Sequence, residues 1–190
     1  VDYAHTPDAL EKALASIMAL TPGRTVCVFG CGGDRDASKR PIMGKAALAA
    51  DHAVVTSDNP RTEDPEFILS QVEEGVDEAI GTKHHELIVD RRHAIYRAIE
   101  MAETDDIVVI LGKGHENYQI LKDKTIHFDD KEEARAAVAA KLAKKTLDNA
   151  GIKNDEKGTK ALFFISQAQI KALATLAVAD DIEDKKAYKE

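Results

Sequence analysis

The chain has 190 residues, 44% of them hydrophobic and 32% charged, which is enough for one well-buried domain with an appendage. The formal net charge of −8 and the lack of a long basic run argue against nucleic acid and anionic membrane surfaces as partners. No apolar stretch approaches the ~18 residues of a membrane span and no signal peptide is visible, so we expect a cytoplasmic location.

Helix-start signals and apolar runs alternate along the first part of the chain. Thr6 and Pro7 are typical of a helix start, because threonine caps free N–H groups and proline fits the first turn. Short runs rich in valine and isoleucine predict buried strands. In chain order we expect a helix after Thr6, a strand at 26–29, a helix from Pro41, a strand at 52–56, a helix from Asp64, a strand at 86–89, a helix after Asp90 and a strand at 107–111.

The same patterns predict how some of these elements pack. The strand at 107–111 is entirely apolar, so we expect it to lie at the centre of the sheet. Helical spacing predicts that the helix from Pro41 turns its apolar residues inward, namely Ile42, Ala46, Ala49 and Ala50. The helix from Asp64 carries Phe67, Ile68, Val72 and Val76 at the same kind of spacing. We expect the pair His84-His85 to lie in a loop, and most histidines to lie on the surface.

The rest of the chain predicts a closing β-hairpin, formed by 118–121 and 125–128, and an alanine-rich helix at 131–145. Because the chain opens on valine rather than on an initiator methionine, we expect a piece cut at a domain boundary. The element order predicts an α/β fold with a doubly wound, mostly parallel sheet. We expect a domain at 1–145, a linker at 146–160 and a helical C-terminal tail at 161–190. The tail must dock on the domain, pair with another chain or be part of something truncated.

Three loops that combine glycine with charge follow the predicted strands. They are Gly30-Cys-Gly-Gly33, Asp58-Asn-Pro-Arg61 and Gly112-Lys-Gly-His-Glu116. In such sheets, ligands bind beyond the carboxyl ends of the strands, where these loops would meet. The planar fork of Arg61 suits a carboxylate, and Glu116 can accept hydrogen bonds from an ammonium group. The three loops therefore predict a site for a small zwitterion.

Each of these features also has a simpler interpretation. Asp58–Arg61 could be only a turn before a helix, and Gly112–Glu116 only a flexible bend. The first glycine turn has Arg35 where a dinucleotide-binding motif needs glycine, and the chain has no P-loop. Cys27 and Cys31 form no disulfide framework, and with scattered histidines they give no zinc motif.

Five motifs follow one another along the first 119 residues. They are Val1-Asp-Tyr-Ala-His-Thr-Pro-Asp8, Gly30-Cys-Gly-Gly-Asp-Arg-Asp36, Lys39-Arg-Pro41, Asp58-Asn-Pro-Arg61 and Gly112-Lys-Gly-His-Glu-x-Tyr-Gln119. In this order and spacing they resemble the C-terminal domain of the Mur ligase family, in its diaminopimelate-adding (MurE) branch. The resemblance covers residues 1 to about 145, and nothing in 146–190 matches the family pattern.

The resemblance implies one part of an ATP-dependent amide-bond ligase of peptidoglycan synthesis. In this family the other domains hold the UDP-MurNAc-dipeptide, ATP, Mg²⁺ and a carbamylated lysine, so we expect this chain alone to be inactive. By position, the resemblance implies that Asp2 meets the ATP ribose and that His5 lies near the nucleotide. It assigns the contacts with meso-diaminopimelate to Arg35, Asn59, Arg61, Gly112 and Glu116, with no catalytic residue and no metal ligand in this chain.

Two alternatives stay open at this point. One is a non-catalytic binding or interaction module whose tail helix recruits a partner. The other is a domain similar to folylpolyglutamate synthase, although Tyr3 and Thr6 depart from the Asp-Gly-Ala-His-Asn start of that family.

Overall fold

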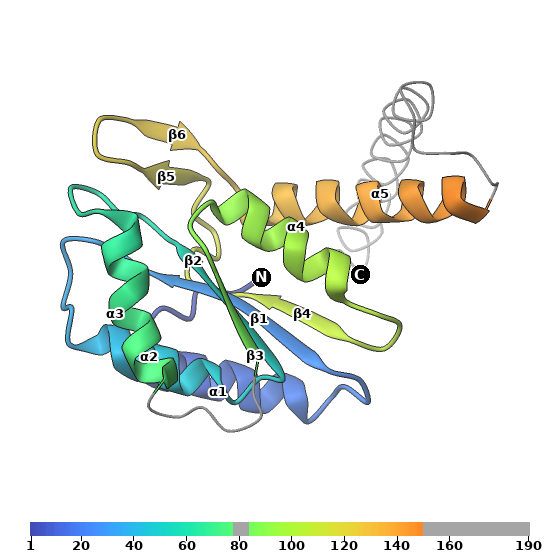
Figure 1. Cartoon of the computed structure of the whole chain (residues 1–190), viewed down its shortest axis with the longest axis horizontal. Helices are drawn as coiled ribbons and strands as arrows, with labels where there is room; N and C mark the ends of the chain where they lie inside the picture. Colours follow the sequence, from blue (N-terminus) through green and yellow to red (C-terminus); the bar gives the residue numbers. More distant parts are fainter. Residues whose placement is uncertain (78–83, 150–190) are drawn as a thin grey trace, which may run out of the picture. The chain divides into compact units, whose positions relative to one another are not determined.

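The computed structural model describes residues 1–77 and 84–149, so most of the expected linker and the whole tail at 161–190 lie outside the described residues. The chain divides into two compact units, 1–134 and 135–190, and the first carries the sheet and the site loops. The helices and strands are α1 (Pro7–Met18), β1 (Thr25–Cys31), α2 (Lys39–Ala47), β2 (His52–Ser57), α3 (Pro65–Asp77), β3 (His84–Ile88), α4 (Arg91–Met101), β4 (Ile107–Ile110), β5 (Tyr118–Ile120), β6 (Thr125–His127) and α5 (Asp130–Asn149) (Figure 1).

The expected order of helices and strands is confirmed within the described residues. α1 begins after Thr6, whose side chain accepts a hydrogen bond from the Ala9 N–H at 3.3 Å, with Pro7 in the first turn. α4 begins after Asp90, which accepts from the His93 N–H at 2.7 Å. Local capping chemistry therefore fixed both helix starts as the sequence indicates.

A four-stranded parallel sheet has the order β3-β2-β1-β4. The chain moves outward from β1 to β2 and β3, and then returns to pair β4 on the other side of β1. The direction therefore reverses between β1 and β4, which makes a topological switch point where ligands bind in sheets of this kind. β5 and β6 form a separate antiparallel hairpin, as expected.

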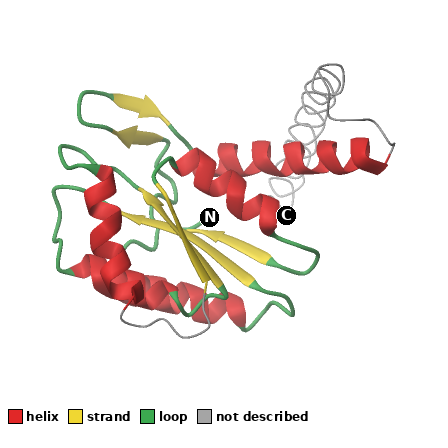
Figure 2. Cartoon of the chain, viewed as in Figure 1, coloured by secondary structure: helices red, strands yellow, loops and turns green. Residues whose placement is uncertain are grey.

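Helices cover both faces of the sheet, so the fold is doubly wound (Figure 2). Alternate side chains of β1 face opposite ways: Cys27 and Phe29 join the core cluster that includes Leu10, Leu14 and Met43 from α1 and α2. The intervening valines of β1 are also buried, on the face that α4 covers with its own buried isoleucines.

The sequence-based expectation that 107–111 lies at the sheet centre is wrong. β4 is at one end of the strand order, and the sheet centre is β1 with β2. The second half of β4 is buried on both faces of the sheet: Val109 belongs to the cluster that includes Phe29, and Ile110 is buried outside that cluster, whereas Ile107 and Val108 are only partly buried. An apolar strand therefore indicates that helices cover both faces of the sheet at that strand. It does not indicate where the strand lies in the strand order.

The expected inward positions on α2 and α3 need correction. α2 begins at Lys39 rather than Pro41, and Ile42 and Ala49 are exposed while Met43, Ala46 and Ala47 are buried. α2 lies so close to α3 that a Cβ on Gly44 would come within 2.1 Å of the Val72 carbonyl oxygen, so the small residues of α2 face α3. Phe67 on α3 is also exposed.

Two boundaries also differ from the expectation. His84 and His85 begin β3 rather than lying in a loop, because they pair in register with His52 and Ala53 of β2. The last helix extends to Asn149, beyond its expected end at residue 145. None of the described helices is long and apolar enough to cross a membrane.

Candidate functional site

A cavity of about 480 Å³ lies at the carboxyl ends of β1, β2 and β4, on the switch-point side of the sheet. The three loops singled out in the sequence all contribute to its wall. The lining residues are Tyr3, His5, Thr6, Gly30, Cys31, Gly32, Arg35, Asp36, Lys39, Arg40, Met43, Asp58, Asn59, Arg61, Gly112, Glu116 and Tyr118. The convergence expected of these loops is therefore present in the structure.

The loops after β1 and β2 are joined to each other through their backbones. The Gly33 N–H donates to the Asn59 carbonyl oxygen at 2.9 Å. A Cβ at position 33 would lie 1.9 Å from the Pro60 carbonyl oxygen, so only glycine allows this approach. Arg61 has a φ of +53°, in the left-handed region, and donates from Nη1 to the Gly33 and Asn59 carbonyl oxygens at 2.8 and 3.3 Å. One guanidinium nitrogen thus holds both loops.

Three arginines, Arg40, Arg61 and Arg91, donate to carbonyl oxygens in the site loops or directly before them, and two of the three have a carboxylate partner in the protein. Arg40 is 1% exposed, pairs with Glu63 through two 2.8 Å contacts and donates to the Gly32 carbonyl oxygen at 3.2 Å. Arg61, by contrast, forms no ion pair with a carboxylate of the described residues, and its Nε and Nη2 donate to none of them. Its outer edge is therefore available to an external carboxylate.

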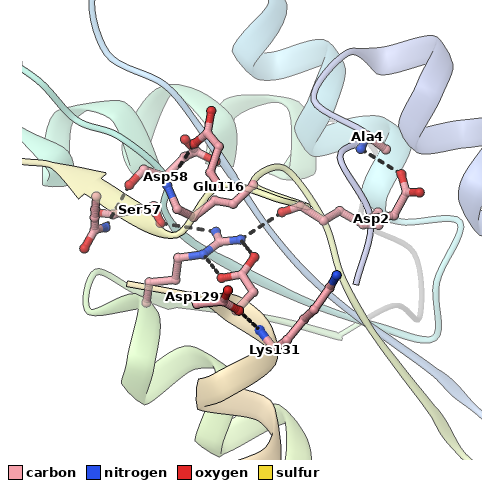
Figure 3. Close-up of polar contacts among 12 residues, drawn as sticks. Asp2, Ala4, Ser57, Asp58, Glu116, Asp129 and Lys131 are labelled. Atoms are coloured by element: carbon pink, nitrogen blue, oxygen red, sulfur yellow. Dashed lines mark hydrogen bonds and ion pairs between the residues drawn. The ribbon is translucent and has the colours of Figure 1, made fainter. Parts of the chain in front are cut away.

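The second buried pair lies beneath the cavity. Arg91 Nε and Nη2 donate to the two carboxylate oxygens of Asp130 at 2.8 and 2.7 Å. Its Nη1 and Nη2 also donate to the carbonyl oxygens of Ser57 and Leu111, which end β2 and directly follow β4. Figure 3 shows Ser57, Asp58 and Glu116 around this network. The pair therefore connects the two strand ends from which the Asp58 and Gly112 loops emerge.

Glu116 and Asn59 face each other across these loops. Asn59 is 2% exposed and donates from Nδ2 to Glu116 Oε2 at 3.0 Å, while its Oδ1 accepts from the Ile120 N–H at 2.9 Å. Lys113 Nζ lies 3.1 Å from Asn59 Oδ1 and 3.1 Å from Glu116 Oε2. The amide of Asn59 is thereby fixed, and it orients the carboxylate.

The charge state of Glu116 follows from these contacts. Burial would raise the pKa of Glu116, but hydrogen bonds from Asn59 and Lys113, with the nearby charges of Lys113 and Arg61, outweigh it and lower the pKa. Glu116 therefore carries a negative charge at neutral pH. An anionic Glu116 and a cationic Arg61 line the same cavity, which gives it one pole of each sign.

The first residues of the chain are part of the site edge. Asp2 continues the sheet beside β4, with its N–H donating to the Ile110 carbonyl oxygen at 3.0 Å and its carbonyl oxygen accepting from the Gly112 N–H at 3.1 Å. The Asp2 carboxylate accepts from the Ala4 N–H at 2.8 Å (Figure 3). The ring of His5 lies 4.5 Å from that of Tyr3 and lines the cavity.

Six residues assigned to ligands from the sequence line this one cavity: Arg35, Asn59, Arg61, Gly112, Glu116 and His5. Asp2 lies outside the lining but is hydrogen-bonded to Gly112. Arg35 is exposed, and no residue of the described ranges pairs with it. The sequence analysis missed Lys113 and the Arg91–Asp130 pair. Lys113 could have been recognised, because it stands between two glycines and three residues before a glutamate. The Arg91–Asp130 pair could not, because its two residues are far apart in the sequence.

Comparison with known proteins gives the family. Residues 1–114 match the family model described as "Mur ligase, glutamate ligase domain". This chain belongs to the Mur ligase family. The Mur ligase match covers β1, β2, β4 and the glycine turns that bring Arg35, Asn59 and Arg61 together.

The chain is similar to enzymes named UDP-N-acetylmuramoyl-L-alanyl-D-glutamate–2,6-diaminopimelate ligase. It is 58% identical over 139 residues to that of Synechocystis sp., covering 73% of this chain and 27% of the relative. It is 53% identical over 143 residues to that of Syntrophomonas wolfei, covering 75% of this chain and 29% of the relative. A solved structure of such a ligase matches with a TM-score of 0.69 and 50% identity, over 74% of this chain and 28% of that one. The chain thus spans less than a third of the length of these Mur ligases.

Metal-ligating side chains do not cluster in the part of the chain that the structure describes. No group of three or more His, Cys, Asp or Glu side chains in 1–77 and 84–149 could hold a metal ion. The expectation that Mg²⁺ is held mainly by other domains stays a prediction.

Proposed function

We propose that this chain is the amino-acid-binding domain of an ATP-dependent ligase that adds meso-diaminopimelate to UDP-MurNAc-L-Ala-D-Glu in peptidoglycan synthesis. The observation that carries the proposal is the pairing of Arg61, which has no internal carboxylate partner in the described residues, with the ionised Glu116 in one cavity. An aminocarboxylate end of diaminopimelate offers a carboxylate to the first and an ammonium group to the second. The names of the relatives agree with this ligand.

Diaminopimelate carries an aminocarboxylate at each end, whereas lysine carries only an ammonium group at its distal end. Arg61 therefore has a partner in one ligand and none in the other. Gly112, Asn59 and Arg35 complete the wall around this end of the ligand. The distal carboxylate of diaminopimelate, which lysine lacks, is therefore the group by which the site would select between the two amino acids.

In the proposed reaction, ATP transfers its γ-phosphoryl group to the terminal carboxylate of the nucleotide-peptide, which gives an acyl phosphate and ADP. The free amine of diaminopimelate attacks the acyl carbon, a C–N bond forms, the C–O bond to phosphate breaks, and the nitrogen loses a proton. None of the described side chains of this domain needs to act as nucleophile. The domain positions the amine and shields the acyl phosphate from water.

The edge formed by Asp2 and His5 is proposed to contact ATP. Asp2 is held by two backbone hydrogen bonds beside β4 and is exposed, so its carboxylate can accept from ribose hydroxyl groups. The rings of His5 and Tyr3 pack at a tilted angle of 53°, and both line the cavity, which gives it an aromatic surface. A cytoplasmic location, where the nucleotide substrates are made, stays a prediction.

The experiment is an NMR titration of the isotopically labelled 190-residue chain with meso-diaminopimelate, lysine and ATP. We expect diaminopimelate to shift the amide signals of the loops at 30–33, 58–61 and 112–116, with a lower dissociation constant than lysine. Absence of any shift with diaminopimelate up to tens of millimolar, or equal affinity for the two amino acids, would refute the proposed substrate. The chain alone should form no amide from ATP, because the expected nucleotide-activating parts are supplied by other domains.

A further inference from the structure

The ammonium group of Lys113 is completely buried behind Asn59 and Glu116, which line the cavity. Its side chain is 0% exposed, and its position depends on two glycines with positive φ, Gly112 at +115° and Gly114 at +55°. Nζ lies 3.1 Å from Asn59 Oδ1, 3.1 Å from Glu116 Oε2 and 5.5 Å from the centre of the Tyr118 ring. A buried charge is stable only with such partners, so this cation is a fixed part of the site.

Lys113 changes what Glu116 can offer to a ligand. Glu116 Oε2 already accepts from Lys113 and from Asn59, whereas Oε1 accepts from no donor of the described residues. An incoming ammonium group therefore meets one carboxylate oxygen, and a carboxylate whose charge is already balanced by a neighbouring cation. A second cation at the same carboxylate is repelled by the first.

We propose that Lys113 is a specificity-determining residue that rejects amino acids ending in a bare ammonium group. With the charge of Glu116 balanced, an ammonium group alone gains little at this end of the cavity. An aminocarboxylate end gains more binding free energy than a bare ammonium group, because its carboxylate adds the contact with Arg61. Lys113 thus works against lysine, while Arg61 works in favour of diaminopimelate.

This inference rests on the proposed substrate, and the test separates the two. The variant is Lys113→Met, which keeps most of the side-chain volume and removes the charge. The matched control is Lys122→Met, an exposed lysine in the turn between β5 and β6. Dissociation constants for meso-diaminopimelate and lysine are measured by the same NMR titration of the whole chain.

We expect Lys113→Met to bind lysine more tightly and to lower the preference for diaminopimelate about tenfold, equivalent to ~1.4 kcal/mol, with no change in the control. A preference equal to that of the wild type, or an equal loss for both ligands, would overturn the inference and leave the proposed substrate intact. A wild-type chain without preference would instead refute the proposed function. If Lys113→Met does not fold, Lys113→Gln keeps hydrogen-bond donors without the charge and must give the same change in preference.

Discussion

The guanidinium of Arg91 and the carboxylate of Asp130 form an ion pair in which both side chains are 0% exposed. The two residues are 39 positions apart and begin two different helices, α4 and α5. The same guanidinium holds the carbonyl oxygens of Ser57 and Leu111, so one buried cation ties the ends of β2 and β4 together below the cavity.

Removal of one partner of this pair should destabilise the fold. Asp130→Ala leaves a buried guanidinium unpaired, and we expect a loss of about 3–5 kcal/mol in the free energy of unfolding, measured by urea denaturation. The double variant Arg91→Met/Asp130→Leu should recover most of that stability, because apolar residues of similar volume replace the pair. It should still bind diaminopimelate more weakly, since the donors to Ser57 and Leu111 are gone. A double variant as unstable as the single one would contradict this account.

Loss of Arg61 should remove selection for the distal carboxylate. Because Arg61 has a φ of +53°, Arg61→Asn is the better variant, since asparagine tolerates the left-handed region. Arg61 is half-buried, so we expect the low end of the 2–5 kcal/mol effect of an unpaired charge, about thirtyfold in the preference for diaminopimelate over lysine. Here diaminopimelate loses affinity and lysine does not, as titration of both ligands would show. An equal loss for both would assign Arg61 to loop structure alone.

A methyl group at position 32 should displace the Arg61 guanidinium without unfolding the chain. A Cβ on Gly32 would lie 2.9 Å from Arg61 Nη1, the far end of a flexible side chain, and its next neighbour is 3.6 Å away. We expect Gly32→Ala to bind diaminopimelate more weakly with a melting temperature close to that of the wild type. Gly33→Ala is the contrasting variant: it meets the Pro60 backbone oxygen and should lower the melting temperature. Unchanged binding by Gly32→Ala would mean that the guanidinium position is not critical.

Acid should weaken the fold through Asp106, away from the cavity. Hydrogen bonds from Arg24 and from the Glu103 N–H lower the pKa of Asp106 from 3.8 to about 2. Because the folded-state pKa lies below the unfolded one, the stabilisation is complete above about pH 4 and is lost as the pH falls towards 2. Asp106→Asn should therefore reduce stability at pH 7 and show a smaller deficit at pH 2.5, measured by urea denaturation at both values. An equal deficit at both would assign the effect to lost geometry.

Both cysteines should resist alkylation while the chain is folded. Burial raises the pKa of Cys27 to about 12 and, with the nearby charge of Asp58, that of Cys31 to about 12. At pH 8 the reactive thiolate is then roughly one part in ten thousand. We expect no modification by iodoacetamide in the native state and modification of both in urea, monitored by mass spectrometry. Rapid native labelling of Cys31 would show that the end of β1 opens.

The placement of the site was predictable because its signals are local. Glycine turns followed by charge stand directly after strands, and parallel strands bring their carboxyl ends to one edge. These signals predict a common position for Arg61 and Glu116, and both residues line the cavity. The helix starts at Thr6 and Asp90 were equally local, since each cap acts within one turn.

The features that sequence could not give depend on contacts between distant segments. The edge position of β4 depends on strand order, which an apolar run does not specify. The outward side of Ile42 depends on the close packing of α2 on α3. The burial of Lys113 depends on Asn59, which lies 54 positions earlier in the chain. From the sequence alone a lysine is expected to be exposed. Lys113 is buried because a residue distant in the chain pairs with its ammonium group.

The pairing of β1 with β4 bears on how the cavity is assembled during folding. The two strands are neighbours although α2, β2, α3, β3 and α4 lie between them in the chain. Such long-range pairing closes late during folding, so the wall carrying Gly112 and Glu116 arrives only when the rest of the sheet has assembled. A partly folded chain therefore has an incomplete cavity wall, and the full cavity forms only when the sheet is complete.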